Sequence, residues 1–280
     1  LPQFAAYPLL FTDDGHRALE DYFAGYADLG RRRGVGVLLD TPTWRAGSDW
    51  GRLLGDDQAV VDEANARAVA LLLDVRARFE TPGSPIVVSG AIGPRGDGYV
   101  SGDEMTSSAA AAYHGPQVRQ LALAGVDVVS ALTMTYPSEA IGIADAAAAT
   151  SVPCAVAFTV EVDGHLPNGE SLGDAIGAVD AATSGSVAYY MINCAHPAHF
   201  EAALDTGEDW VSRVRGIRAN ASMASHAELD EAETLDSGNP TALAEHLVRL
   251  QDRHRHVTLL GGCCGTDERH IDAIAQRIRS

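Results

Sequence analysis

The sequence contains no lysine, and all 20 of its basic side chains are arginine. Without a lysine amine, Schiff-base chemistry is excluded, and with it a large class of aldolases. The basic residues are outnumbered by 38 acidic ones, which gives a formal net charge of −18. Because nucleic acid and anionic membrane surfaces would be repelled by this charge, we exclude both as partners and expect a small-molecule substrate.

Long apolar runs and cysteines are also scarce. No apolar run reaches about 18 residues and no signal peptide opens the chain, so we expect a cytoplasmic protein without a membrane span. Four cysteines in 280 residues are too few for a disulfide scaffold. Their clustering instead favours metal or redox chemistry in a reducing compartment. The sequence leaves an oligomer possible.

Seven β-branched or aliphatic runs alternate with helical patterns along the chain. This alternation predicts an α/β fold with a parallel sheet, and over 280 residues the leading candidate is a (β/α)8 TIM barrel, a single domain of residues 1–280. We expect strands at 35–40, 86–89, 126–133, 154–160, 187–194, 216–220 and 257–260. We expect helices at 13–33, 56–79, 106–124, 137–150, 174–183, from 197, at 241–252 and at 268–279.

One strand of the eight is missing from this pattern. The helix predicted at 13–33 has no strand before it, whereas every other predicted helix has one. We therefore expect a further strand upstream of Leu1, unless the apolar opening at 1–12 stands in for it.

The strongest chemical motif is Gly261-Gly262-Cys263-Cys264-Gly265-Thr266, which directly follows a predicted strand. A third cysteine, Cys194, lies at the end of another predicted strand. In a parallel barrel all strand exits open on one face, so these thiols can meet across 69 residues of sequence. Three thiolates with a fourth position open are the ligand set of a catalytic Zn²⁺ that binds another sulfur. A buried cysteine cluster, a structural zinc site and a redox role for the vicinal cysteines are the alternatives. Cys154 stands near the start of its strand, so we expect it in the core.

A thiol bound to such a metal ionises and stays nucleophilic at neutral pH. This suits in-line attack on a methyl group attached to a cationic sulfur or nitrogen. Two nearby histidines, His196 and His199, have workable ligand spacing. We expect His196 at a helix cap and His199 inside that helix instead. The acidic segment 228–236 is expected to be solvated.

Together with the loop Ser89-Gly90-Ala91-Ile92-Gly93-Pro94, the two cysteine motifs resemble the homocysteine S-methyltransferase family over essentially the whole chain. The family consists of zinc-dependent (β/α)8 barrels. The resemblance implies that Cys194, Cys263 and Cys264 hold zinc, and that homocysteine accepts the methyl group to give methionine. S-methylmethionine, S-adenosylmethionine or betaine would suit as donor.

Several polar side chains at strand exits are candidates for contacts with the substrate. The resemblance implies that the exit Thr41-Pro42-Thr43-Trp44 lines the substrate pocket. Hydroxyls and amides at the exits can orient a substrate or cap the following turn. The candidates are Thr41, Thr43, Ser89, Thr133, Asn193 and Asn220.

The sequence departs from the family at two places where the family binds an amino-acid acceptor. The family's Asp-Gly-Gly strand is absent, and Leu132 stands where the family has a glutamate for the substrate ammonium. Because a buried ammonium needs a partner, these losses favour a different thiol or selenol acceptor, or a non-catalytic, zinc-binding thiol sensor. Asp40 and Glu161, at two strand exits, are candidates to replace the missing carboxylates.

Overall fold

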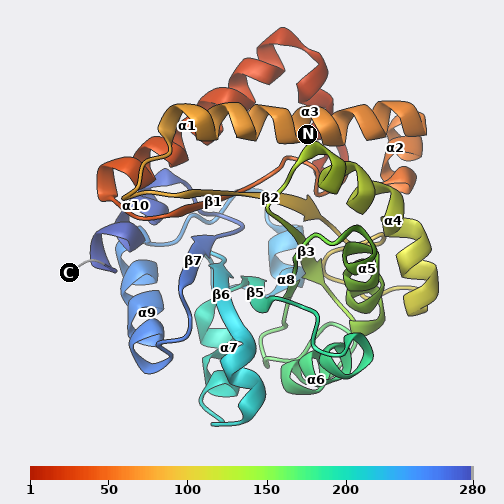
Figure 1. Cartoon of the computed structure of the whole chain (residues 1–280). Helices are drawn as coiled ribbons and strands as arrows, with labels where there is room; N and C mark the ends of the chain where they lie inside the picture. Colours follow the sequence, from red (N-terminus) through yellow and green to blue (C-terminus); the bar gives the residue numbers. More distant parts are fainter. Residues whose placement is uncertain (279–280) are drawn as a thin grey trace. The chain divides into compact units, whose positions relative to one another are not determined.

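The computed structural model describes residues 1–278, which form an α/β fold (Figure 1). Its strands follow one another in chain order in one sheet, and the adjacent pairs β1–β2, β2–β3, β5–β6 and β6–β7 are parallel. The strands are β1 (Val37–Asp40), β2 (Ile86–Ile92), β3 (Val128–Met134), β4 (Cys154–Phe158), β5 (Tyr189–Ala195), β6 (Val214–Ala219) and β7 (Leu259–Gly262). All seven predicted strands are thus confirmed.

Helices lie in the chain segments before, between and after these strands. They are α1 (Asp13–Arg33), α2 (Ser48–Leu54), α3 (Gln58–Phe79), α4 (Ser107–Ala124), α5 (Pro137–Thr150), α6 (Leu172–Thr183), α7 (Pro197–Leu204), α8 (His226–Glu231), α9 (Pro240–Arg253) and α10 (Glu268–Arg277). A short 3-10 helix, η3 (Asp209–Arg213), precedes β6. None of the helices within residues 1–278 is long and apolar enough to cross a membrane.

The eighth strand does not occur among residues 1–278. The apolar opening forms two 3-10 helices, η1 (Pro2–Phe4) and η2 (Tyr7–Phe11), so it does not stand in for a strand. Arg279, the last residue of the final predicted helix, lies outside the described residues.

The chain divides into two compact units. Unit 1 comprises Leu1–Arg95, Glu104–Leu132 and Ser138–Ala155. Unit 2 comprises Gly96–Asp103, Thr133–Pro137 and the chain from Val156 onward. The prediction of a single domain is not tested by this division.

In unit 1, α1 and α3 begin at side-chain caps. Thr12 accepts a hydrogen bond from the backbone of Gly15 and Asp57 accepts one from Val60, which satisfies amides that the first helical turn leaves unpaired. The left-handed Gly34 (φ 60°) ends α1. These boundaries match the predicted ones closely because their cap residues are visible in the sequence.

In unit 2, the strand that leads to Cys194 is firmly anchored. The Tyr190 ring on β5 is fully buried and stacks on Phe158 with 6.3 Å between centroids. Its hydroxyl donates to Asp180 at 2.8 Å, and Arg213 donates to the same carboxylate at 2.9 Å. A rigid β5 fixes the point at which the chain leaves the sheet.

Two helices have no counterpart in the sequence prediction. Helix α2 follows Gly47 without a side-chain cap, so no local signal marks its start. Helix α8 occupies the beginning of the acidic segment that we expected to be solvated, and a capping box of Ser225 and Glu228 starts it. Its first residue, His226, is buried but precedes the segment 228–236. The described side chains within that segment are exposed or half-buried, as expected.

Gly142 of α5 provides a test of helix packing in unit 1. A Cβ there would lie 2.5 Å from Ala110 Cβ and 2.5 Å from Ala111 N of α4, whereas a Cβ on Gly177 of α6 would meet no atom within 4 Å. Gly142→Ala is expected to lower the free energy of unfolding by about 1–3 kcal/mol through overpacking. Gly177→Ala is expected to raise it by about 0.5–1 kcal/mol through helix propensity. Chemical denaturation followed by circular dichroism measures both, and equal shifts would contradict the close approach of α4 and α5.

Candidate metal centre

Three cysteine sulfurs converge in unit 2. Cys194 Sγ lies 2.7 Å from Cys263 Sγ and 3.7 Å from Cys264 Sγ. Among residues 1–278, these three form the group of potential metal ligands, with all three sulfurs within 4.8 Å of one another. All are free thiols. The geometry therefore offers three soft ligands from two strand ends to one cation.

Cys194 is the extra residue of a β-bulge at the end of β5. Asn193 pairs with Arg218 and Ala195 pairs with Ala219, so the register passes over Cys194. Its φ of 56° lies in the left-handed region, which costs a residue with a Cβ free energy. Bulges re-aim side chains, and this one turns the Cys194 sulfur toward the cysteines that follow β7.

The carbonyl oxygen of Cys194 is held from two sides. Asn220 Nδ2 donates to it at 2.9 Å, and His226 Nε2 lies 2.8 Å from it. The Asn220 Oδ1 atom accepts from the backbone amide of Cys264 at 3.1 Å. One buried carboxamide thus joins the backbones of two of the three cysteines and fixes the direction of both side chains.

Cys263 and Cys264 lie in a tight turn after β7. Thr266 Oγ1 donates to the carbonyl of Cys263 at 2.7 Å. Gly265 adopts a φ of 78°, a conformation that glycine enters without strain. A Cβ on Gly262 would lie 2.1 Å from Thr266 Oγ1, so this turn requires glycine before the cysteine pair.

The crowded sulfurs do not ionise equally. Hydrogen bonds from Cys194 and Cys263 lower the pKa of Cys264 to about 2. Hydrogen bonding to Cys263 and then to Cys264, with burial, raises the pKa of Cys194 well above its usual value. One thiolate is therefore favoured without a cation, while ionisation of all three at such distances needs a positive charge among them.

Tyr99 contacts two of the three cysteine sulfurs. The sequence did not predict this residue as part of the site. Its hydroxyl lies 3.3 Å from Cys264 Sγ and 3.8 Å from Cys194 Sγ. Its ring stacks on His226 at 4.1 Å between centroids. Burial first, then electrostatic interaction with the neighbouring cysteines, raises the pKa of Tyr99, so the phenol stays protonated and can donate to the Cys264 thiolate. No motif surrounds this tyrosine in the sequence that would have identified it.

A shallow recess adjoins Cys194. Its lining includes Glu161, Val162, His199, Asn220 and His226. Glu161 Oε1 lies 3.1 Å from His226 Nδ1, and the Glu161 side chain is 34% exposed. The recess therefore presents one reachable carboxylate beside the sulfurs.

Of the six predicted substrate contacts, Asn193 and Thr133 lie together in unit 2. Asn193 Oδ1 accepts from the Thr133 backbone amide at 2.9 Å, and its Nδ2 donates to Thr133 Oγ1 at 2.8 Å. Thr133 has a φ of 62°, which is rare for a β-branched residue. The Asn193 amide therefore stabilises a strained strand end, as Asn220 does for Cys194. Direct contact of these residues with a substrate stays a prediction.

The remaining three, Thr41, Thr43 and Ser89, are buried in unit 1. Thr41 and Thr43 lie together, with 2.6 Å between hydroxyl oxygens, and both bond to the backbone of Ala91. The Ser89 hydroxyl lies 2.8 Å from that of Ser130. These hydroxyls hold the exits of β1 and β2 in place, and their contact with a substrate stays a prediction.

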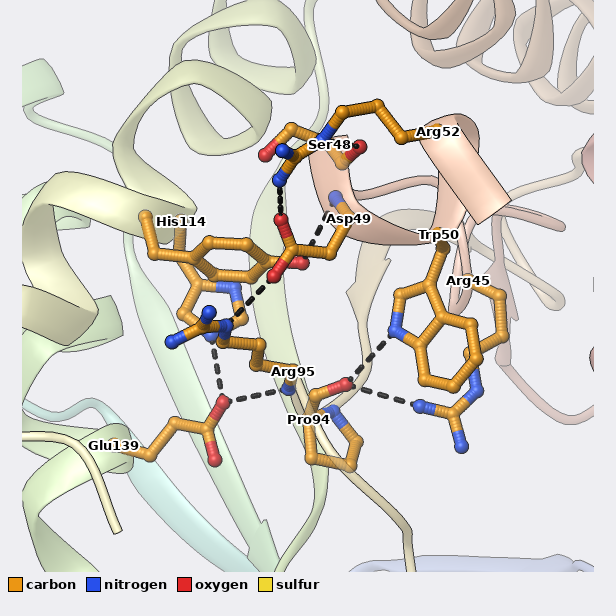
Figure 2. Close-up of polar contacts among 10 residues, drawn as sticks. Arg45, Ser48, Asp49, Trp50, Arg52, Pro94, Arg95, His114 and Glu139 are labelled. Atoms are coloured by element: carbon orange, nitrogen blue, oxygen red, sulfur yellow. Dashed lines mark hydrogen bonds and ion pairs between the residues drawn. The ribbon is translucent and has the colours of Figure 1, made fainter. Parts of the chain in front are cut away.

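Unit 1 contains a separate buried polar cluster around the loop that leaves β2 (Figure 2). Glu139 Oε1 lies 2.8 Å from His114 Nε2 and accepts from the Arg95 amide at 2.7 Å. On the other side, the Pro94 carbonyl accepts from Arg45 and Trp50. Because both Glu139 and His114 are only 1% exposed, this carboxylate holds the loop and is not accessible to a ligand.

His196, His199 and Cys154 lie outside the group of three converging cysteines. His196 caps α7 by accepting from the Ala198 amide at 3.2 Å, as predicted. His199 lies inside α7, and its Nε2 is 3.1 Å from the Met223 carbonyl. Cys154 is buried in the core, where desolvation raises its pKa to about 12.

Comparisons with known proteins bear on the family and the fold of the chain. The family profile described as Homocysteine S-methyltransferase matches residues 5–278. None of the curated protein sequences matches the chain. Among solved structures, the homocysteine methyltransferase MmuM from Escherichia coli is similar in its oxidized form, with 22% identity, a TM-score of 0.78, and coverage of 98% of this chain and 88% of that chain.

The metallated form of the same E. coli protein has a TM-score of 0.77 at 22% identity, with the same coverage of 98% and 88%. Its apo form has a TM-score of 0.67 at 24% identity, covering 92% of this chain and 85% of that one. At these identities the structures establish the shared fold, and the profile match over nearly the whole sequence establishes the family. The chain belongs to the homocysteine S-methyltransferase family.

Proposed function

We propose that this protein is a zinc-dependent S-methyltransferase that moves a methyl group from an onium donor to the thiolate of homocysteine, giving methionine. The observation that carries the proposal is the convergence of the Cys194, Cys263 and Cys264 sulfurs within 4.8 Å. Membership of the family supports homocysteine as acceptor. The metallated form of the E. coli relative supports a metal at the cysteines.

The three residues fit zinc by the chemistry of their donor set. Thiolates are the ligands that zinc prefers over hard cations, and three of them leave one tetrahedral position for a further sulfur. Bound there, zinc supplies a Lewis acid that keeps the acceptor thiol ionised at neutral pH. The lowered pKa of Cys264 favours its thiolate form and so supports its role as a metal ligand.

The protein's own residues orient the site for this reaction. Asn220 and His226 hold the carbonyl of Cys194, and Tyr99 directs its hydroxyl at Cys264. The acceptor thiolate attacks the methyl carbon of the donor, the new C–S bond forms as the bond to the onium atom breaks, and the donor leaves neutral. Positioning of the two reactants in line supplies much of the rate.

The finer features of the protein are part of the same proposal. The donor is S-methylmethionine, S-adenosylmethionine or betaine, all of which carry a methyl group on a cationic atom. The seven strands in chain order support a (β/α)8 barrel as a single domain. Free thiols at the site suit the reducing conditions of the cytoplasm.

Metal analysis combined with a donor panel tests the proposed function. The purified protein is expected to hold roughly one zinc per chain, to release a proton when homocysteine binds, and to form methionine with one of the three donors. Removal of zinc with a chelator under reducing conditions should abolish turnover, and added zinc should restore it.

The outcomes separate the proposal from its rivals. Absence of bound metal under reducing conditions would contradict the zinc site. Zinc binding with methylation of another thiol or a selenol, but not of homocysteine, would identify a different acceptor. Zinc binding without turnover for any pair of donor and acceptor would indicate a non-catalytic thiol sensor.

A further inference from the structure

We propose that Tyr99 protects the protein's own cysteines from methylation, because its hydroxyl hydrogen-bonds the exposed Cys264 sulfur and makes that sulfur a poorer nucleophile than the acceptor thiolate. Tyr99 is thus a positioning residue that helps to decide which sulfur takes the methyl group. This inference rests on the proposed function, since a methyl donor beside the cysteines is what endangers them.

A metal site built from cysteines competes with its own substrate in this chemistry. Cysteines bind a metal as thiolates, and a thiolate is the nucleophile that a cationic methyl donor meets. If Cys264 Sγ attacked the donor's methyl carbon, a C–S bond would form, the bond from that carbon to the onium atom would break, and the donor would leave neutral. The product is a thioether without negative charge, which holds zinc less tightly than a thiolate does. Each such event would disable one site.

The three sulfurs are not equally open to a donor. Cys194 is 6% exposed, Cys263 is half-buried, and Cys264 is exposed. The sulfurs of Cys194 and Cys263 also lie closest together, at 2.7 Å. A methyl donor that approaches from solvent would therefore meet Cys264 first.

The Tyr99 hydroxyl is directed at this exposed sulfur. It lies 3.3 Å from Cys264 Sγ and 3.8 Å from Cys194 Sγ, all within unit 2. Because a phenol has one proton, the shorter contact receives the hydrogen bond, and an ionised Cys264 can only accept it. The Tyr99 ring stacks on His226, which in turn contacts Glu161 Oε1 at 3.1 Å. These contacts hold the hydroxyl in place.

A hydrogen bond to a thiolate lowers its reactivity. The proton stabilises the charged sulfur, and a more stable thiolate is a weaker nucleophile. Among residues 1–278, Tyr99 is the hydrogen-bond donor to Cys264 Sγ from outside the three cysteines. Asn220 contacts the Cys264 backbone and does not contact its sulfur. An acceptor thiolate would not share the Tyr99 proton, so it keeps its full nucleophilicity.

The experiment measures methylation of each cysteine by peptide mass spectrometry after the zinc-bound protein is treated with methyl iodide, without an acceptor thiol. Tyr99→Phe keeps the ring that stacks on His226 and removes the hydroxyl. It is expected to raise the rate of Cys264 methylation about 3- to 10-fold, because a hydrogen bond to a charged group stabilises it about 10- to 100-fold and nearly half of that effect appears in the rate of attack. The rates for Cys194 and Cys263 should change less.

Tyr113→Phe is the matched control. The Tyr113 hydroxyl also makes a hydrogen bond, accepting from the Asp49 amide at 3.3 Å in unit 1. Its removal should leave Cys264 methylation unchanged. An equal rise in both variants would trace the effect to a general loosening of the protein and overturn the inference.

Methyl iodide needs no donor site, so this test is independent of the proposed function. A selective rise at Cys264 in Tyr99→Phe would support the inference even if none of the three onium donors gives turnover. Turnover with one of those donors, combined with equal Cys264 methylation in the wild type and Tyr99→Phe, would overturn the inference and leave methyl transfer intact. Loss of zinc from untreated Tyr99→Phe would assign the hydroxyl to metal binding and also overturn it.

Discussion

Replacing Cys263 by serine is expected to remove the bound metal and to lower methyl transfer at least about 1,000-fold, which corresponds to about 4 kcal/mol of transition-state stabilisation. Cys263 Sγ lies 2.7 Å from Cys194 Sγ and is one of the three converging sulfurs. A serine hydroxyl stays protonated at neutral pH and is a hard, weak ligand for zinc. Two remaining thiols would not hold the metal against solvent.

Metal content, thiol titration and turnover of Cys263→Ser measure this effect. The matched control is Cys154→Ala, which removes a fully buried thiol from the core and leaves the cluster intact. The control should keep about one zinc per chain and wild-type turnover, at a small cost in stability. Retention of stoichiometric zinc by Cys263→Ser would show that the metal is bound elsewhere.

The sequence predicted the strand exits well because their signals are local. Each β-branched or aliphatic run forms a strand through the pattern of the run itself, and each cysteine motif follows such a run directly. The rule that parallel strands end at one face then brings residues distant in sequence together, and in unit 2 Cys194 does meet Cys263. Spacing alone was enough for this part of the site.

The surroundings of the cysteines were harder to predict because their signals are tertiary. Tyr99 lies in an irregular loop, and nothing beside it in the sequence marks its approach to Cys264. His226 begins a six-residue helix just before the acidic segment 228–236, and nothing beside it in the sequence marks its burial against the Cys194 carbonyl. The β-bulge at Cys194 is equally invisible in the sequence, because it depends on the register with β6.

The same limit applies to the predicted roles of the amides. Asn193 and Asn220 were candidates for substrate contacts because they stand at strand exits. In the structure both bond to backbone at strained residues, Asn193 at Thr133 and Asn220 at Cys194. A sequence shows that an amide is present at an exit, but only the fold shows which backbone groups need it.

Replacing Asn220 by alanine is expected to raise the dissociation constant for zinc about 10- to 100-fold, the range seen when groups that orient metal ligands are removed. The Cys194 carbonyl would keep only His226, and the Cys264 amide would lose its side-chain acceptor. Loss of these two buried hydrogen bonds should also lower the free energy of unfolding by about 1–3 kcal/mol. The left-handed Cys194 would then be free to relax, which would turn its sulfur away from the other two.

Competition with a chromogenic chelator measures the zinc affinity, and denaturation of the metal-free protein measures the stability separately. Asn168→Ala is the matched control, since Asn168 bonds to Glu170 in a loop of unit 2 and has no contact with the cysteines. A purely structural role for Asn220 would lower the stability of the metal-free protein and leave the zinc affinity of the folded protein unchanged. A positioning role requires the affinity to fall in protein that is still folded, because the carboxamide acts through the direction of Cys194 and Cys264 and not through contact with the metal.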